Sequence, residues 1–227
     1  MSGYDWTLYL VTDRRQAGTR PLEELVAAAV RGGVTAVQLR EKDCATREFV
    51  ELARALRTLL APLGIPLIVN DRADVALAAG ADGVHVGQSD MDCRDVRRLL
   101  GPSAVIGLSV ENLQQAVAAP PEADYLGVGP VFSTPTKTDT GPEWGLEGLA
   151  ALRRVSRRQL VAIGGIHADN AAHVIGCGAD GIAVVSAICA ARDPELAART
   201  LRREIGRGRS VGHASACPGE LRSPAPR

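Results

Sequence analysis

The sequence has few aromatic residues, no net charge and no long apolar run. Aromatic side chains make up 3% of its 227 residues, too few for the stacking platforms that bind single-stranded nucleic acids. Its 26 basic and 26 acidic side chains cancel, which removes the electrostatic basis for a general nucleic-acid or membrane-surface role. No apolar run approaches the roughly 20 residues of a membrane-spanning helix. We therefore expect no nucleic-acid partner, no membrane partner, and only local anion sites.

The cysteines show no pattern of a metal site or a disulfide framework. There are five of them, scattered along the chain, and no C-x-x-C pair occurs. This favours reduced thiols over disulfides or zinc ligands. The N-terminus has no charged-then-apolar signal pattern. We expect a cytoplasmic protein, and the sequence leaves its state open between a monomer and a homo-oligomer.

Short runs rich in β-branched residues recur along the chain and predict eight strands. Between them lie alanine- and leucine-rich stretches with apolar residues at helical spacing, as at Leu22, Leu25 and Val26. Eight such pairs in about 205 residues predict an α/β protein with one closed (β/α)8 barrel, an open doubly wound sheet being the alternative. The predicted strands are Trp6–Thr12, Ala36–Arg40, Pro66–Asn70, Gly83–Gly87, Val105–Val110, Tyr125–Gly129, Leu160–Gly164 and Gly181–Ser186.

Two segments depart from this rhythm. Residues 131–144 form a stretch of Thr, Pro, Lys and Gly longer than a usual βα connection, which predicts a substrate-covering loop. After residue 206 the composition turns to Gly, Ser, Pro and Arg, so we predict a barrel domain over 1–206 and a disordered tail over 207–227. The segments AGADGV (79–84) and CGADGI (177–182) resemble each other, as expected of repeated βα units.

The segment Gln38 to Lys42 carries the strongest functional signal. It follows an apolar run and places Gln38, Arg40 and Lys42 on one face of a strand, because side chains alternate with period two. A strand covered on both faces is otherwise nearly all apolar. Two cations at its end are costly unless an anion meets them. We interpret this face as half of a diphosphate site.

Nearly all of the remaining predicted strands are also followed by polar residues. In a parallel barrel, the carboxyl ends of the strands form the active site. Asp71 and Asp90 follow neighbouring strands. They can pair with nearby cations such as Lys137, or hold Mg²⁺, which favours one or two carboxylates with phosphate oxygens. No His/Cys cluster suggests zinc. His85 lies inside a predicted strand and is expected to be a hydrogen-bonded core residue.

Glycines after the last strands predict a phosphate site. Gly164-Gly165 and Val185-Ser186 occupy the place where barrels often bind phosphate on backbone N–H groups. A complete dinucleotide fingerprint and a P-loop motif are both missing from the sequence, which argues against NAD and ATP-type sites. The motifs also assemble no nucleophile with a nearby base.

Seven motifs in order resemble the thiamine-phosphate synthase family. They are QLREK (38–42), NDR (70–72), GVHVGQSD (83–90), GLS (107–109), GVGPVFSTPTK (127–137), AIGGI (162–166) and GIAVVSAI (181–188). The resemblance runs from about Tyr9 to Ala198 and omits mainly the tail. Met91-Asp92 is a small departure, standing where a Leu-Pro-like pair is expected.

The resemblance implies a TIM barrel and a transferase of thiamine biosynthesis. Members join 4-amino-2-methyl-5-(diphosphooxymethyl)pyrimidine to 4-methyl-5-(2-phosphooxyethyl)thiazole and release diphosphate with Mg²⁺, which Asp71 and Asp90 are implied to bind. The residues implied to bind the pyrimidine diphosphate are Gln38, Leu39, Arg40, Glu41, Lys42, Asn70, Ser109 and Lys137, of which Arg40, Lys42, Lys137 and Ser109 are also implied in catalysis. Those implied for the thiazole phosphate are Thr134, Pro135, Thr136, Gly165, Val185 and Ser186.

Three other functions remain as alternatives. A related barrel that isomerises thiazole phosphate needs a base but neither Mg²⁺ nor the diphosphate cations. A non-catalytic sensor of thiamine phosphates predicts tight product binding without turnover. A sugar-phosphate epimerase or lyase needs an inward acid–base pair, which the motifs do not supply.

Overall fold

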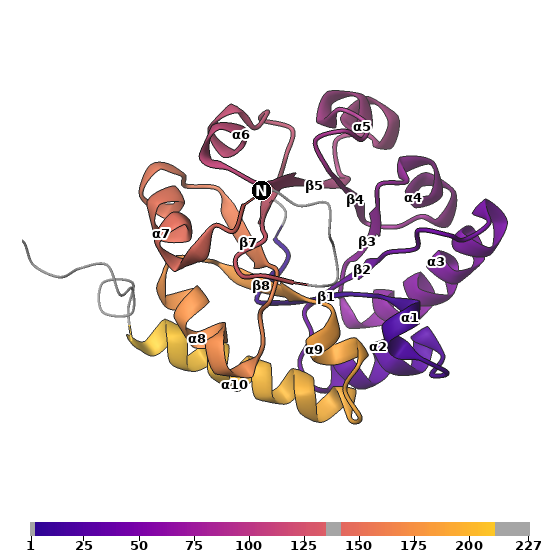
Figure 1. Ribbon diagram of the computed structural model, residues 1–227. Helices are drawn as coiled ribbons and strands as arrows, with labels where there is room; N and C mark the ends of the chain where they lie inside the picture. Colours follow the sequence, from indigo (N-terminus) through magenta and orange to yellow (C-terminus); the bar gives the residue numbers. More distant parts are fainter. Residues whose placement is uncertain (1–2, 135–141, 212–227) are drawn as a thin grey trace, which may run out of the picture.

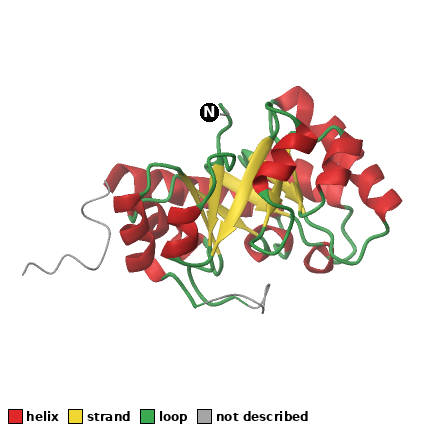
Figure 2. Ribbon diagram, turned by 90° about the horizontal axis from the view of Figure 1, so that it is seen from above, coloured by secondary structure: helices red, strands yellow, loops and turns green. Residues whose placement is uncertain are grey.

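Eight parallel strands close into a barrel in sequence order, with helices around the outside (Figure 1, Figure 2). The computed structural model describes residues 3–134 and 142–211. Strand β1 pairs with both β2 and β8, which confirms the TIM barrel and excludes the open sheet. The strands are β1 Leu8–Val11, β2 Ala36–Leu39, β3 Leu67–Asn70, β4 Gly83–Val86, β5 Val105–Val110, β6 Tyr125–Val128, β7 Gln159–Ile163 and β8 Gly181–Val184.

Helices follow the strands and cover the outside of the barrel. Their apolar stripes face the strands, as on α2, where Leu22, Leu25 and Val26 are buried as the spacing predicts. The helices are α1 Arg14–Ala17, α2 Leu22–Arg31, α3 Thr46–Leu60, the 3₁₀ turn η1 Ala61–Leu63, α4 Ala73–Ala79, α5 Cys93–Leu100, α6 Leu113–Ala118, α7 Gly145–Val155, α8 Ala168–Gly176, α9 Ser186–Cys189 and α10 Pro194–Val211.

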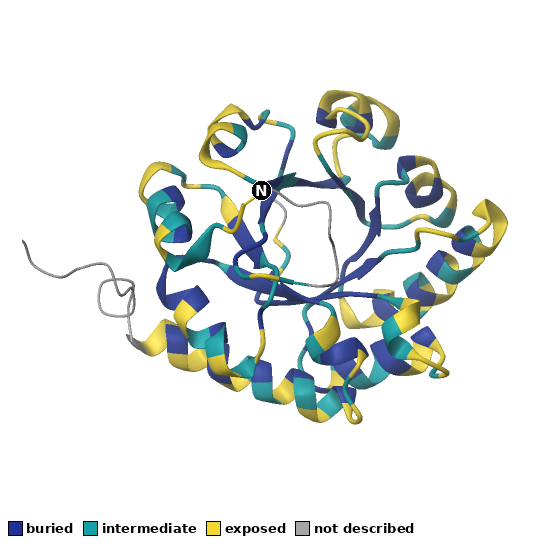
Figure 3. Ribbon diagram, in the orientation of Figure 1, coloured by how far each residue is buried: buried dark blue, intermediate teal, exposed yellow. Residues whose placement is uncertain are grey.

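The strands separate two apolar layers. Leu8 and Leu10 point outward into the large core between strands and helices, while Tyr9 and Val11 point into the barrel, as period-two alternation requires. Most strand residues are buried, whereas the helices alternate buried and exposed faces (Figure 3). Trp6, Tyr9 and Tyr125 gather inside the barrel, where Trp6 stacks on Tyr125 with ring centroids 4.5 Å apart. These rings fill the lower interior beneath the open end.

A repeated hydrogen bond ties the strands together at their amino ends. Each even-numbered strand is preceded by a polar residue whose side chain accepts the N–H of a residue at the start of the strand before it. Three of the four are carboxylates. The bonds are Leu8 N to Thr35 Oγ1 at 3.0 Å, Leu67 N to Asp82 Oδ2 at 2.9 Å, Ile106 N to Asp124 Oδ2 at 2.8 Å and Leu160 N to Asp180 Oδ2 at 2.7 Å. The similar segments 79–84 and 177–182 each contain one of these accepting residues, Asp82 and Asp180.

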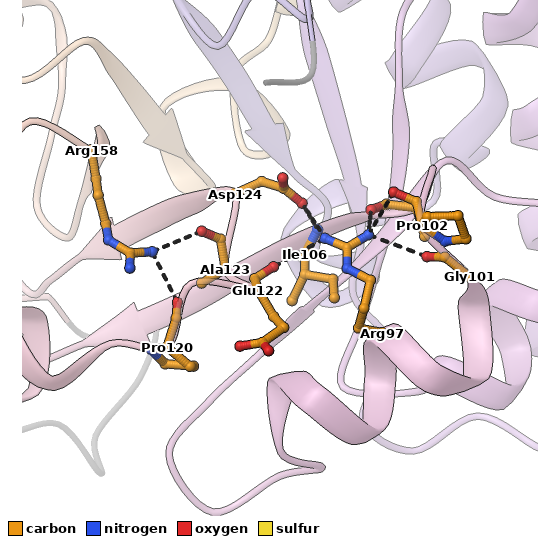
Figure 4. Close-up of polar contacts among 10 residues, drawn as sticks. Arg97, Gly101, Pro102, Ile106, Pro120, Glu122, Ala123, Asp124 and Arg158 are labelled. Atoms are coloured by element: carbon orange, nitrogen blue, oxygen red, sulfur yellow. Dashed lines mark hydrogen bonds and ion pairs between the residues drawn. The ribbon is translucent and has the colours of Figure 1, made fainter.

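At each of the three carboxylates, an arginine from the helix before the odd-numbered strand completes the contact. Arg97 of α5 reaches Asp124 at 2.9 Å and also donates to backbone carbonyls of the 101–104 turn (Figure 4). Arg153 contacts Asp180 at 2.9 Å, and Arg57 approaches Asp82 at 3.4 Å. We call these Asp–Arg pairs the strand clamps. At the amino end of the barrel, the polar side chains thus bond to the backbone and to each other. Functional side chains of such barrels lie at the carboxyl end.

The last helix extends past residue 206, where the predicted domain ends. Helix α10 packs against α8 and α2 and continues to Val211 (Figure 1). Arg209 donates to Thr7 Oγ1 at 2.7 Å, so the expectation of disorder from residue 207 is wrong for 207–211. Residues 212–227 lie outside the described residues, and their disorder stays a prediction.

The structure also bears on two further expectations, that the thiols are reduced and that the protein has no membrane partner. Cys44, Cys93 and Cys189 are free, as expected of reduced thiols, and Cys217 lies outside the described residues. Within 3–134 and 142–211, no helix combines the length and the apolar character needed to cross a membrane.

Candidate active site

A cavity of about 510 Å³ opens at the carboxyl ends of the strands. Every strand contributes at least one lining residue, from Tyr9 on β1 to Ala183 on β8. The inner wall is apolar and aromatic, and the rim carries charged and polar side chains. This is the end of the barrel at which the sequence places the site.

Most of the residues expected in the site line this one cavity. They are Gln38, Arg40, Lys42, Asn70, Asp71, Asp90, Ser109, Thr134, Gly165, Val185 and Ser186. Pro135, Thr136 and Lys137 lie outside the described residues, so the roles expected of them stay predictions. The same holds for 135–141 of the expected covering loop, although its base is anchored by Trp144 N, which donates to Pro130 O at 2.8 Å.

Two expected ligands lie away from the cavity. Leu39 is fully buried in the layer between strands and helices, because it alternates with the inward-facing Gln38. The Glu41 carboxylate lies 3.4 Å from Arg14 Nε, with its side chain 8% exposed. Burial raises the pKa of Glu41, and the charge of Arg14 opposes this only in part.

The two cations at the rim differ in their partners. Lys42 Nζ donates to Asp71 Oδ2 at 2.8 Å, so part of its charge is already matched. Arg40 is fixed through its backbone, where its N–H donates to Thr12 Oγ1 at 3.1 Å. Its guanidinium has no ion-pair partner in the described part of the chain. The cavity mouth therefore carries a positive group available to an anion.

Two carboxylates share the cavity with these cations. Asp71 has a positive φ of 62°, and its backbone N–H donates to His85 O at 2.8 Å, which holds this strained residue in place. Asp90 Oδ2 accepts the Gly87 N–H at 2.7 Å. Among the described residues, the Oδ1 atom of each carboxylate has no hydrogen-bond partner. Two carboxylates with open oxygens suit Mg²⁺, which completes its shell with phosphate and water oxygens.

The turn after β7 requires glycine at two successive positions. Gly164 and Gly165 have φ values of 102° and 63°. A Cβ at Gly164 would lie 2.7 Å from Pro130 Cα, and one at Gly165 would lie 2.7 Å from Ser133 O. Asn170 Nδ2 donates to Gly165 O at 2.9 Å and fixes the turn from α8. The backbone of this turn lines the cavity without side chains in the way.

A chain of hydrogen bonds crosses the floor of the cavity. Gln38 Nε2 donates to Tyr9 Oη at 3.1 Å, and Tyr9 Oη lies 3.0 Å from Tyr125 Oη. Tyr125 Oη is 2.9 Å from His85 Nδ1, and His85 Nε2 is 2.8 Å from Ser109 Oγ. We call these five groups the floor chain. His85 is the hydrogen-bonded core residue expected, whereas the two tyrosines were missed because a single aromatic residue in a strand predicts only packing.

A family model described as thiamine monophosphate synthase matches residues 8–188 of the chain. The chain belongs to the thiamine-phosphate synthase family. It is 62% identical to a thiamine-phosphate synthase of Albidiferax ferrireducens over 87% of this chain and 91% of that one. It is 56% identical to one of Xanthobacter autotrophicus, over 89% and 96% of the two chains.

Solved structures agree with this family. A thiamine phosphate pyrophosphorylase from Pyrococcus furiosus superposes with a TM-score of 0.82 at 41% identity, covering 90% of this chain and 98% of that one. A 3-hexulose-6-phosphate synthase, at 20% identity and a TM-score of 0.66, shares the fold alone. Membership in the thiamine-phosphate synthase family makes the chain a transferase of thiamine biosynthesis that acts on small molecules.

Proposed function

We propose that the chain joins 4-amino-2-methyl-5-(diphosphooxymethyl)pyrimidine to 4-methyl-5-(2-phosphooxyethyl)thiazole, with diphosphate as the second product. The single observation that carries this proposal is the rim of the cavity, where a guanidinium with no ionic partner among the described residues lines the same cavity as a lysine and two carboxylates, in a protein of zero net charge. Such a rim favours a polyanion that arrives with a divalent cation.

The rim offers two separate anion sites, one for each phosphorylated substrate. Arg40 and Lys42 follow β2, and Asp71 follows β3, so the diphosphate would bind over these neighbouring strand ends. Gly165 and Ser186 follow β7 and β8, which are also neighbours. The thiazole phosphate would bind there on backbone N–H groups. The separation supports a reaction between two anionic substrates better than the binding of one.

The reaction needs charge stabilisation more than a base. The C–O bond to diphosphate breaks with its electron pair leaving on oxygen, and the thiazole nitrogen forms the C–N bond with its own lone pair. No proton is transferred in these steps. Arg40 and Lys42 would stabilise the charge that builds on the leaving oxygens, and Lys42 keeps donors to spare beyond its bond to Asp71.

Mg²⁺ held by Asp71 and Asp90 would add positive charge against the same diphosphate. The inner wall of the cavity would protect the carbocation formed on departure of the diphosphate. Val11, Val161, Ile163 and Ala183 line it, and none of their side chains can react as a nucleophile. Excluding water there prevents hydrolysis of a reactive intermediate.

Omission assays on the purified chain test this function. Diphosphate and thiamine phosphate are measured with both substrates and Mg²⁺, and then with each component left out. We expect one diphosphate per thiamine phosphate in the complete mixture, and loss of thiamine phosphate whenever one component is omitted. Conversion of the thiazole phosphate alone would indicate an isomerase instead. Tight binding of thiamine phosphate without any turnover would indicate a sensor.

A further inference from the structure

We propose that Tyr9 and Tyr125 are positioning residues which fix the proton of His85 on Nε2 and thereby present the Ser109 hydroxyl to the substrate as a hydrogen-bond donor. The claim concerns the direction of every hydrogen bond in the floor chain. It deepens the proposed function and rests on it for the identity of the substrate, but the direction itself is a property of the protein alone.

The direction starts at Gln38. Its side chain is 5% exposed, and its Nε2 can only donate, so Tyr9 Oη accepts at 3.1 Å. A phenol has one hydrogen, and the oxygen 3.0 Å away on Tyr125 is the acceptor that the chain offers it. Tyr125 has then accepted one hydrogen bond and must donate its own hydrogen onward. Both rings are fully enclosed, and burial raises the pKa of each phenol, so both remain neutral donors.

The same argument fixes the imidazole. Tyr125 donates to His85 Nδ1 at 2.9 Å, so Nδ1 carries no hydrogen and the neutral ring carries its proton on Nε2. Nε2–H then donates to Ser109 Oγ at 2.8 Å. Ser109 has accepted a bond and lines the cavity, so its hydroxyl hydrogen is directed to a ligand. At the other end, Gln38 Oε1 remains as an acceptor on the cavity wall. The floor chain therefore presents one donor and one acceptor to the substrate.

The barrel leaves space for this arrangement at two glycines. Gly107 is the strand partner of both His85 and Tyr125, and a Cβ there would lie 2.2 Å from Tyr125 Cζ and 2.4 Å from His85 Nδ1. Gly127 is the partner of Ser109, and a Cβ there would lie 2.7 Å from His85 Cε1. Any other residue at these inward positions displaces the imidazole. The close packing holds His85 between its two partners.

The side-chain ¹⁵N shifts of His85 test the direction without any activity measurement. We expect a pyrrole-type Nε2 and a pyridine-type Nδ1 in the unaltered chain. Tyr9→Phe removes the donor that orients Tyr125, so we expect a mixture of the two tautomers in that variant. Tyr4→Phe is the matched control, because Tyr4 Oη contacts Asp82 Oδ1 at the amino end of the barrel, and it should leave the shifts unchanged. A proton on Nδ1 in the unaltered chain, or an unchanged tautomer in Tyr9→Phe, would overturn the proposal.

Kinetics test whether Tyr9 acts through Ser109. We expect Tyr9→Phe to lower kcat about tenfold with KM changed less than about twofold, the scale of one lost hydrogen bond. In a Ser109→Ala background the same change should cost less than about twofold, because the group it orients is gone. Independent, multiplying losses would contradict the link. If no thiamine phosphate forms at all, the proposed function fails, while the ¹⁵N result still decides the direction of the floor chain.

Discussion

Arg40 and Lys42 are two cations with different roles at the same rim. Lys42 is balanced by Asp71, and this pair lies at the surface, where an ion pair contributes little to stability. Arg40 has no ionic partner among the described residues, so its charge is not required by the fold. The proposed function gives this guanidinium a partner, the diphosphate of the substrate. Arg40 is therefore the residue at which function and stability separate most clearly.

Arg40→Ala should lower kcat/KM for thiamine phosphate formation about 100-fold, the scale of losing one charge-stabilising group. The free energy of unfolding should change by less than about 0.5 kcal/mol, as for surface positions outside structural contacts. Steady-state kinetics and urea unfolding measure the two effects. Arg15→Ala is the control, because Arg15 pairs with Asp43 away from the cavity and should affect neither. A near-normal rate in Arg40→Ala would remove it from the site.

Glu41 differs from Arg40, because burial of its carboxylate disfavours the charged form and so lowers the stability of the fold. Its pKa is raised by desolvation, with the charge of Arg14 only partly offsetting this. An acid whose pKa is raised on folding lowers stability above that pKa and has no such effect once protonated. Glu41→Gln should therefore raise the melting temperature at pH 7. The gain should shrink as the pH falls through the raised pKa toward the ordinary carboxyl range, and a gain independent of pH would contradict the assignment.

At the scale of elements, the two ends of the barrel are built on different principles. The amino end is fixed by the strand clamps, in which a carboxylate accepts a strand N–H and an arginine from the preceding helix neutralises it. Each such bond involves a charged group and is stronger than a neutral one. At the carboxyl end, the residues that follow the strands are instead glycines and polar residues that line the cavity. The chain thus concentrates its structural hydrogen bonds at one end and its ligand groups at the other.

Asp124→Ala should lower the free energy of unfolding by about 2–3 kcal/mol, because the Ile106 N–H and Arg97 lose their charged partner. Urea unfolding measures this, and kcat should stay within about twofold of normal. Asp95→Ala is a matched control from the same region, since Asp95 pairs with Arg98 on the surface and should cost less than about 0.5 kcal/mol. Equal effects in the two variants would show that the strand clamp is not a stabilising contact.

The elements themselves could be predicted from the sequence, but their cross-strand contacts could not. All eight strands lie where the β-branched runs place them, because burial on both faces leaves a local apolar signature. In the strand clamps, each carboxylate lies 15 to 20 positions from the strand N–H that it accepts, and the floor chain joins Tyr9 to Tyr125, so both depend on barrel register. The QLREK motif as a whole predicts Leu39 and Glu41 in the site, whereas alternation turns only Gln38, Arg40 and Lys42 to the cavity.

At the scale of the whole molecule, the last helix packs across the outside of the barrel and joins helices from its two ends in the sequence. Helix α10 packs on α8 and α2, and a Cβ at Gly208 would lie 2.4 Å from Ala172 O, which shows how close the two helices approach. Arg209 donates to Thr7 Oγ1 and to Asp180 O, joining the end of α10 to the segments before β1 and β8. Composition alone predicted a tail from residue 207, because glycine and arginine indicate disorder only when no partner surface is considered.

A chain ending at Gly206 should be less stable than one ending at Val211 by about 1–3 kcal/mol, because it lacks the two hydrogen bonds of Arg209. Urea unfolding of both chains measures the difference. Arg209→Ala in the chain ending at Val211 should reproduce most of the loss. Equal stability of all three would show that residues 207–211 add nothing to the barrel.

The account depends on where the diphosphate binds. A crystal structure of the chain with the pyrimidine diphosphate and Mg²⁺ measures this directly. We predict diphosphate oxygens within about 2.7–3.2 Å of the Arg40 guanidinium and of Lys42 Nζ, with the metal on Asp71 and Asp90. An ester bound with Arg40 and Lys42 both turned away into solvent would contradict it.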